Sequence, residues 1–357
     1  MKIQSEFKKL TYLTFRNIKL YFKDKITFLV SLITPLILLV LFVVFLKSTY
    51  ENSIFSIVEG FNLDQKLINA FTGGWLFSSV LATSCITVAF CSGMMVIDKV
   101  NRANIDFMVS PVKKSTLQLS YVLANLFSTL IIAFVLLLVG LIYLAFVGFY
   151  ITFVDLLLIL FSIIITSLFG TILANIIWTF TRSQGVVSGV CTLVSALYGF
   201  ICGAYMPINT MGKGMQGFVS LLPGTYATVL FRQGFLNGVL KEMGKTLPNE
   251  MIEGISTSFD VKMSFFGHEV STLGLILVIT ISTLVLLGTF LLINLKRHKK
   301  IKKSVIKYLN LESDALKKMQ KHYFEILYNL LLGKNQGPKL GIFLLAVPKE
   351  KLLSLLK

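Results

Sequence analysis

Residues 203–234, "GAYMPINTMGKGMQGFVSLLPGTYATVLFRQG", decide between three very different structures. The segment contains Gly212, Gly214 and Gly217 in the spacing GxGxxG, which in nucleotide-binding folds follows a strand and opens a helix. Here a long apolar run precedes these glycines, so the sequence does not predict a phosphate-binding loop. The segment is therefore either a membrane span or a segment that enters a membrane and returns.

The composition indicates a membrane protein. Hydrophobic residues make up 55% of the 357 positions and charged residues only 14%, and the mean hydropathy is +0.79. Crossing a hydrocarbon core takes about 20 apolar residues in a helix. Six uncharged runs are long enough, so the sequence predicts an all-α polytopic membrane protein with spans at about 26–47, 72–97, 117–148, 153–180, 185–204 and 271–295.

Prolines and glycines interrupt the segment 203–234 too often for it to be a seventh span. A spanning backbone must satisfy its own hydrogen bonds, and Pro207, Pro223 and several glycines would break them. We therefore expect a re-entrant pair over 206–232, with short helices at roughly 208–219 and 223–232 that enter the outer leaflet and return. Pro223 would begin the second helix, where a missing N–H costs nothing.

Lysine and arginine predict the orientation. They concentrate in 1–25, 98–114 and 296–307, and basic residues collect on the cytoplasmic side of a membrane. Both termini are thus expected in the cytoplasm, and the net charge of +17 reflects this topology and anionic lipid rather than nucleic acid. Residues 1–25 predict an amphipathic interfacial elbow helix, or simply a basic flank that orients the first span.

Catalytic and metal sites are not predicted. Cys85, Cys91, Cys191 and Cys202 lie in apolar runs without C-x-x-C spacing, which favours small buried apolar side chains. The three histidines are isolated, so no metal site is expected. Residues 244–246 resemble the end of a P-loop but lack its first glycine, so the chain is not predicted to be an enzyme or to bind a nucleotide.

The predicted spans carry charges only at their ends, at Asp98, Asp155 and Arg182. Ion-coupled secondary transporters place ionisable side chains within the membrane. This pattern disfavours a secondary transporter and indicates that the energy for transport comes from elsewhere. A membrane scaffold or sensor that works without an ATPase remains a second alternative.

The loop 98–114 between the second and third spans is the most informative cytoplasmic feature. It predicts a short helix with apolar side chains among charged ones, followed by Ser110-Pro111-Val112, and exposed apolar side chains need a partner surface. This loop resembles the coupling helix of type-2 ABC exporter permeases. The resemblance implies that an ATPase subunit contacts Asp98, Arg102, Asp106, Phe107, Met108, Ser110 and Pro111.

The segment 203–234 also resembles a stretch of the same family. Its order of Gly203, Pro207-Ile208, Met211-Gly212, Gln216, Pro223-Gly224-Thr225-Tyr226 and Arg232 resembles the stretch between spans five and six of these permeases. The resemblance covers about residues 5–300. It implies a homo- or heterodimer of permease subunits, two cytoplasmic ATPase subunits that hold ATP and Mg, and an outer gate formed by Pro207, Met211, Gln216, Pro223, Thr225, Tyr226 and Arg232.

The sequence also predicts how deeply two side chains of this gate enter the membrane. The Tyr226 ring is expected to be half-buried with its hydroxyl in water, and the charge of Arg232 is expected to stay at the outer interface. The pathway itself is less defined, because polar stripes on spans two and five could either line it or pack helices closely. These stripes are Ser79, Thr83 and Thr87, and Ser188, Thr192 and Ser195.

Two segments extend beyond the family's minimal plan. Residues 233–270 form an outer insertion, and residues 301–357 form a cytoplasmic helical tail. The end of the tail resembles the last helices of class I lysyl-tRNA synthetases in Leu332-Gly333-Lys334, Gly337-Pro338 and Gly341, without any catalytic motif. A small packing module and an RNA contact are the two alternatives for this tail, and no nucleic-acid partner is expected.

Together these features predict the permease subunit of an ATP-driven exporter in a bacterial cell membrane. Its cargo is expected to be amphipathic or hydrophobic, such as a drug, a peptide or a lipid.

Overall fold

The computed structural model describes residues 2–296, apart from 59, 62, 104, 105, 108, 109, 111, 266 and 267, and also residues 321, 322 and 325. For residues 2–5 and 43 it describes the backbone alone. The chain divides into two compact units, Met1–Phe290 and Leu291–Lys357. Except at 321, 322 and 325, the predicted tail with its synthetase-like ending lies outside the described residues, and the first unit is the subject here.

Six helices in the described part of the chain are long and apolar enough to cross a membrane. This confirms the predicted fold class, an all-α polytopic membrane protein. The six are Lys25–Ile57 (α2 Lys25–Leu41, the π-helical turn η1 Phe42–Leu46 and α3 Lys47–Ile57), Gln65–Val100 (α4 Gln65–Cys91 and α5 Met94–Val100), α7 Lys114–Val147, α8 Phe153–Phe180, α9 Gln184–Ile201, and Thr272–Lys296.

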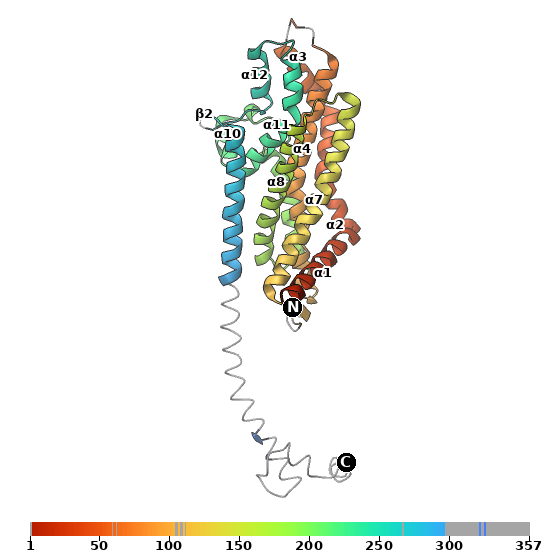
Figure 1. Cartoon of the computed structure of the whole chain (residues 1–357), viewed down its shortest axis with the longest axis vertical. Helices are drawn as coiled ribbons and strands as arrows, with labels where there is room; N and C mark the ends of the chain where they lie inside the picture. Colours follow the sequence, from red (N-terminus) through yellow and green to blue (C-terminus); the bar gives the residue numbers. More distant parts are fainter. Residues whose placement is uncertain are drawn as a thin grey trace. The chain divides into compact units, whose positions relative to one another are not determined.

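Shorter elements complete the first unit. The N-terminal helix α1 covers Lys2–Lys23 and packs along α7. Among the described residues, five further elements lie between α9 and the last spanning helix, in the segment 203–234 and the predicted insertion 233–270. They are η2 Ile208–Thr210, α10 Lys213–Ser220, α11 Pro223–Met243, α12 Asn249–Ser258, and a hairpin of β1 Ser264–Phe265 with β2 His268–Glu269. Figure 1 shows α1 at one end of the bundle, and α3 and α12 at the opposite end.

Several helices extend beyond the apolar runs of the sequence. The first spanning helix continues to Ile57 rather than 47, and the second begins at Gln65 rather than 72. Asp64 caps the second helix by accepting a hydrogen bond from the backbone N–H of Lys66 at 3.0 Å. Hydropathy marks where a helix meets hydrocarbon, whereas caps and backbone hydrogen bonds decide where it ends, so the difference affects only the helix termini.

The central element is α4, which contacts α2, α7, α8, α9 and α11. Its glycines let neighbouring helices approach closely. A Cβ atom at Gly73 would lie 2.6 Å from the Tyr143 ring of α7, and one at Gly74 would lie 3.2 Å from the backbone oxygen of Phe235 in α11. The helix α4 is therefore almost entirely enclosed by the other helices of the subunit.

Two of the four cysteines depart from the prediction. Cys91 at the end of α4 and Cys191 in α9 form a disulfide, with their Cα atoms 5.4 Å apart, whereas Cys85 and Cys202 are free and buried. All four side chains are buried, as predicted, but the disulfide between Cys91 and Cys191 was not predicted. The two residues are 100 positions apart, and no local spacing could indicate that α4 and α9 meet here.

Candidate functional site

The 98–114 loop is fastened to the N-terminal helix by an ion pair. Asp98 on α5 is 4% exposed, and both its carboxylate oxygens accept hydrogen bonds from the guanidinium of Arg16, at 2.9 and 3.0 Å. Tyr121 on α7 donates to the same carboxylate at 2.6 Å. The hydrogen bond to Asp98 raises the pKa of Arg16 above its usual value. Asp98 thus joins α1, α5 and α7.

Arg16 also reaches the middle of the loop. Its guanidinium carbon lies 5.2 Å from the centre of the Phe107 ring, within the range of a cation–π contact. Asp106 and Arg102 are exposed, and the Ser110 hydroxyl donates to the backbone oxygen of Phe107 at 2.9 Å. Met108 and Pro111, which the sequence places in the same ATPase contact, lie outside the described residues.

A second basic residue ties the start of the loop to α8. The ammonium of Lys99 donates to the backbone oxygens of Trp178, Thr179 and Thr181, at 2.6, 3.3 and 3.1 Å. These carbonyls end α8, where cations are favoured by the helix dipole. The loop therefore has polar attachments to α1, α7 and α8.

The segment 203–232 contains two helices, but not with the predicted lengths. The short helix α10 covers Lys213–Ser220, preceded by the turn η2, and Pro223 is the first residue of α11, as predicted. However, α11 continues to Met243, so it is about twice as long as expected and includes the start of the predicted insertion. It packs against α4 and α8, and this tertiary packing sustains a helix whose sequence contains three glycines.

The junction between α10 and α11 is fixed by two hydroxyl groups. Thr225 donates to the backbone oxygen of Val219 at 2.7 Å, and Tyr226 donates to that of Ser220 at 2.8 Å. Tyr226 is 5% exposed, so the expectation of a hydroxyl in water was wrong. Its hydrogen bond goes to the last turn of α10 because the two helices fold back on each other across Leu221 and Leu222.

Gln216 holds the other end of α10. Its amide donates to the backbone oxygens of Asn209 and Met211, at 3.3 and 2.8 Å. Pro207 is buried and directly precedes the turn η2, whereas Met211 is half-buried. The structure therefore brings the predicted gate residues into one continuous unit of turn, short helix and long helix.

Arg232 differs most from its predicted place. The side chain is fully buried, although the sequence suggested a hydrated charge at the outer interface. One terminal nitrogen donates to Asp260 at 2.9 Å, the other donates to the backbone oxygen of Gly203, and the guanidinium carbon lies 4.7 Å from the centre of the Trp75 ring. The charge can be buried because a carboxylate, a carbonyl and an aromatic face replace water.

The two polar stripes have different surroundings. Ser79, Thr83 and Thr87 on α4 are completely buried within the subunit, which favours the close-packing alternative for this stripe. Ser188 and Thr192 on α9 are exposed, whereas Ser195 is half-buried. Only the α9 stripe therefore faces outward from a single subunit, and a role in lining a pathway stays a prediction.

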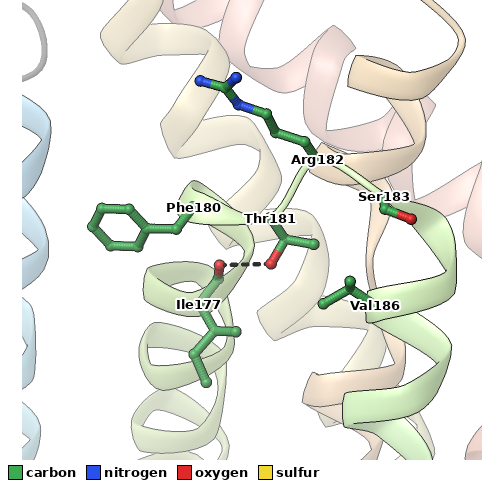
Figure 2. Close-up of a pocket in the computed structure, with 6 residues that line it drawn as sticks. All are labelled: Ile177, Phe180, Thr181, Arg182, Ser183 and Val186. Carbon is green, nitrogen blue, oxygen red and sulfur yellow. Dashed lines mark hydrogen bonds between the residues drawn. The ribbon is translucent and has the colours of Figure 1, made fainter.

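A cavity of about 550 Å³ lies where α8 turns into α9. It is lined by Ile177, Phe180, Thr181, Arg182, Ser183 and Val186. Phe180 and Val186 lie on opposite sides of the turn in Figure 2, and the Arg182 side chain projects from the turn itself. The cavity combines apolar walls with one cation and two hydroxyl groups.

Comparison with protein families decides the identity. A family model described as "ABC-2 type transporter" matches residues 8–236, well over half of the 357 residues. The chain belongs to the ABC-2 type transporter family. It is the transmembrane subunit of an ABC-2 transporter, a multi-pass transport domain that is not itself catalytic. A comparison with curated proteins finds no match.

The sequence missed the partners that hold these ABC-2 elements together. Arg16, Tyr121 and Lys99 on the loop side, and Trp75 and Asp260 on the other, were not predicted. One signal was available for Asp260, because a lone arginine in an apolar stretch needs a counter-ion. The acidic residue that pairs with Arg232 lies 28 positions away along the chain. This pairing follows from the fold rather than from the local sequence.

Proposed function

We propose that this ABC-2 subunit is the permease of an exporter energised by a separate ATPase. The observation that carries the proposal is the 98–114 loop, in which a helical turn presents Asp106 and Phe107 while its base is fixed to three helices. A partner that moves this turn would displace α1, α7 and α8 together. The same loop serves as the coupling helix in the family that the sequence resembles.

The path from the loop to the far end runs through α4. The loop begins at α5, which directly follows α4, and Trp75 near the other end of α4 contacts Arg232. We infer that closure of an ATPase dimer around ATP and Mg pushes the loop, and that α4 carries the displacement to the segment 203–232. That segment then acts as the outer gate. ATP and Mg would be held by the partner subunit.

The proposed assembly contains two permease subunits, identical or different, and two cytoplasmic ATPase subunits in a bacterial cell membrane. Both termini of this chain would face the cytoplasm. Phe7, Tyr12 and Phe15 of α1 are each more than two-thirds exposed, which supports an elbow helix that lies against membrane lipid. The exposed stripe of Ser188 and Thr192 on α9 is the part available to a second permease subunit or to cargo.

An amphipathic cargo is supported by the cavity at the turn between α8 and α9. Its apolar walls suit a hydrocarbon group, and Arg182 forms no ion pair among the described residues, so its charge is available to an anionic head group. Replacing this residue, Arg182→Gln, should weaken transport of anionic amphiphiles by several-fold and leave neutral ones unchanged. Uptake of fluorescent anionic and neutral amphiphiles into inverted membrane vesicles measures the difference.

Co-purification tests the proposal. The tagged full-length chain, extracted gently from its native membrane, should retain an ATPase with nucleotide-binding motifs, and Phe107→Asp should lose it. Phe218→Asp is the matched control, because Phe218 is exposed on α10 at the other functional segment, and it should retain the ATPase. A chain that never retains an ATPase would support a scaffold or sensor, and transport that depends on an ion gradient without ATP would support a secondary transporter.

A further inference from the structure

The region 259–261, between α12 and the β-hairpin, is fastened residue by residue to the bundle. Phe259 accepts a hydrogen bond from the indole N–H of Trp75 at 3.2 Å, through its backbone oxygen. Val261 accepts one from the side-chain amide of Gln233 at 3.1 Å, also through its backbone oxygen. Between them, the carboxylate of Asp260 pairs with Arg232. Three successive residues of the insertion are therefore attached to α4 and α11.

Asp260 makes a second attachment to the segment that precedes α10. The carboxylate oxygen that binds Arg232 also accepts a hydrogen bond from the backbone N–H of Ile208, the first residue of η2. Arg232 in turn binds the backbone oxygen of Gly203, which has a φ of +73° that favours glycine. One ion pair thus connects the exit of α9, the turn η2 and the long helix α11.

The burial of this pair makes it sensitive to any change in charge. The side chains of Arg232 and Asp260 are 0% and 5% exposed. Removing one member of a buried ion pair leaves an uncompensated charge and is strongly destabilising. Asp260 itself has a φ of +51°, a conformation that aspartate tolerates better than most residues.

We propose that Asp260 is a positioning residue that keeps the segment 203–232 closed, so that this segment opens only when the pair with Arg232 is displaced. The inference rests on the proposed role of the segment as an outer gate. The match to the ABC-2 family ends at residue 236, so the arginine lies within the matched region and its carboxylate partner comes from the insertion beyond it. Through this pair the insertion holds the segment 203–232, and we call the pair of Arg232 and Asp260 the clasp.

Native cysteines provide a reporter at the clasp. Cys202 is free, 1% exposed and adjacent to Gly203, whose oxygen Arg232 binds. Burial raises the pKa of its thiol, and a buried, protonated thiol reacts slowly with maleimides. Cys85 on α4 is free and fully buried as well, and it serves as the matched thiol because it belongs to the large apolar core of the subunit.

The experiment measures maleimide labelling of the full chain in unsealed membrane fragments, where the reagent reaches both faces. In a Cys85→Ser background, Asp260→Asn should label Cys202 about tenfold faster than the parent or more, because the neutral amide leaves Arg232 unpaired. Asp260→Glu keeps the charge and should stay much closer to the parent. No nucleotide, cargo or ATPase is needed, so the result is independent of whether transport is found.

A second background separates opening of the clasp from general unfolding. In a Cys202→Ser chain, Asp260→Asn should leave the labelling rate of Cys85 unchanged. An unchanged rate at Cys202 would overturn the proposal. Equal acceleration at Cys85 and Cys202 would also overturn it, because Asp260 would then stabilise the whole bundle rather than the closed segment.

Discussion

At the scale of single residues, two buried carboxylates connect the loop 98–114 and the segment 203–232 to neighbouring parts of the subunit. Asp98 is surrounded by Arg16 and Tyr121, and Asp260 by Arg232 and the backbone N–H of Ile208. Burial raises the pKa of Asp260, and the charge of Arg232 opposes that rise. The sequence predicts charges only at the ends of its spans, whereas the folded subunit buries these two carboxylates beside arginines that lie 82 and 28 positions away along the chain.

The pair between Arg16 and Asp98 allows a direct test at this scale. Arg16→Gln leaves the buried carboxylate without its cation and should lower stability by about 1–3 kcal/mol. Asp98→Asn removes the charge that needs compensation. The double variant should therefore have a higher thermal midpoint than Arg16→Gln alone, measured by thermal unfolding in detergent. A double variant that melts at or below the single variant would contradict the assigned pairing.

At the scale of elements, α10 is held to α11 by two side-chain hydrogen bonds. The variants Thr225→Val and Tyr226→Phe each remove one of these bonds, which contribute about 1 kcal/mol apiece. Together they should accelerate amide hydrogen exchange several-fold in Lys213–Ser220 without changing the core of α11. Thr228→Val is the control, because Thr228 donates to the backbone oxygen of Gly224 within α11 itself. Unchanged exchange in α10 would show that apolar packing alone holds it.

The contact between α4 and α9 predicts the number of reactive thiols. The chain has four cysteines, of which two are free and two form the disulfide. Denatured without a reductant, it should take up two polyethylene-glycol maleimides, and after reduction it should take up all four. Cys191→Ser should expose Cys91 as a third reactive thiol without reduction. Four additions before reduction would contradict the disulfide.

The sequence was informative about elements for a clear physical reason. Transfer of apolar residues into hydrocarbon is additive along a helix, so long uncharged runs located the spanning helices and Pro223 located the start of α11. Hydropathy says nothing about polar helix ends or about helices stabilised by packing. The extension of the first helix to Ile57 and of α11 to Met243 therefore could not be predicted, and neither could the ion pairs that join distant segments.

At the scale of the whole molecule, two polar clusters lie along the helix α4 and its continuation α5. Asp98 of α5 ties the loop 98–114 to α1 and α7, and the pair of Arg232 and Asp260 lies against Trp75 of α4. The central claim is that an ATPase subunit binds the loop 98–114 at Phe107.

Photo-crosslinking tests that claim most directly. The photoreactive amino acid p-benzoylphenylalanine replaces Phe107 in the full chain, with Phe218 as the matched position at the other functional segment, and intact cells are irradiated. We expect a covalent adduct with a nucleotide-binding ATPase from position 107 and none from position 218. Adducts from position 107 that contain no ATPase, or an ATPase adduct from position 218, would contradict it.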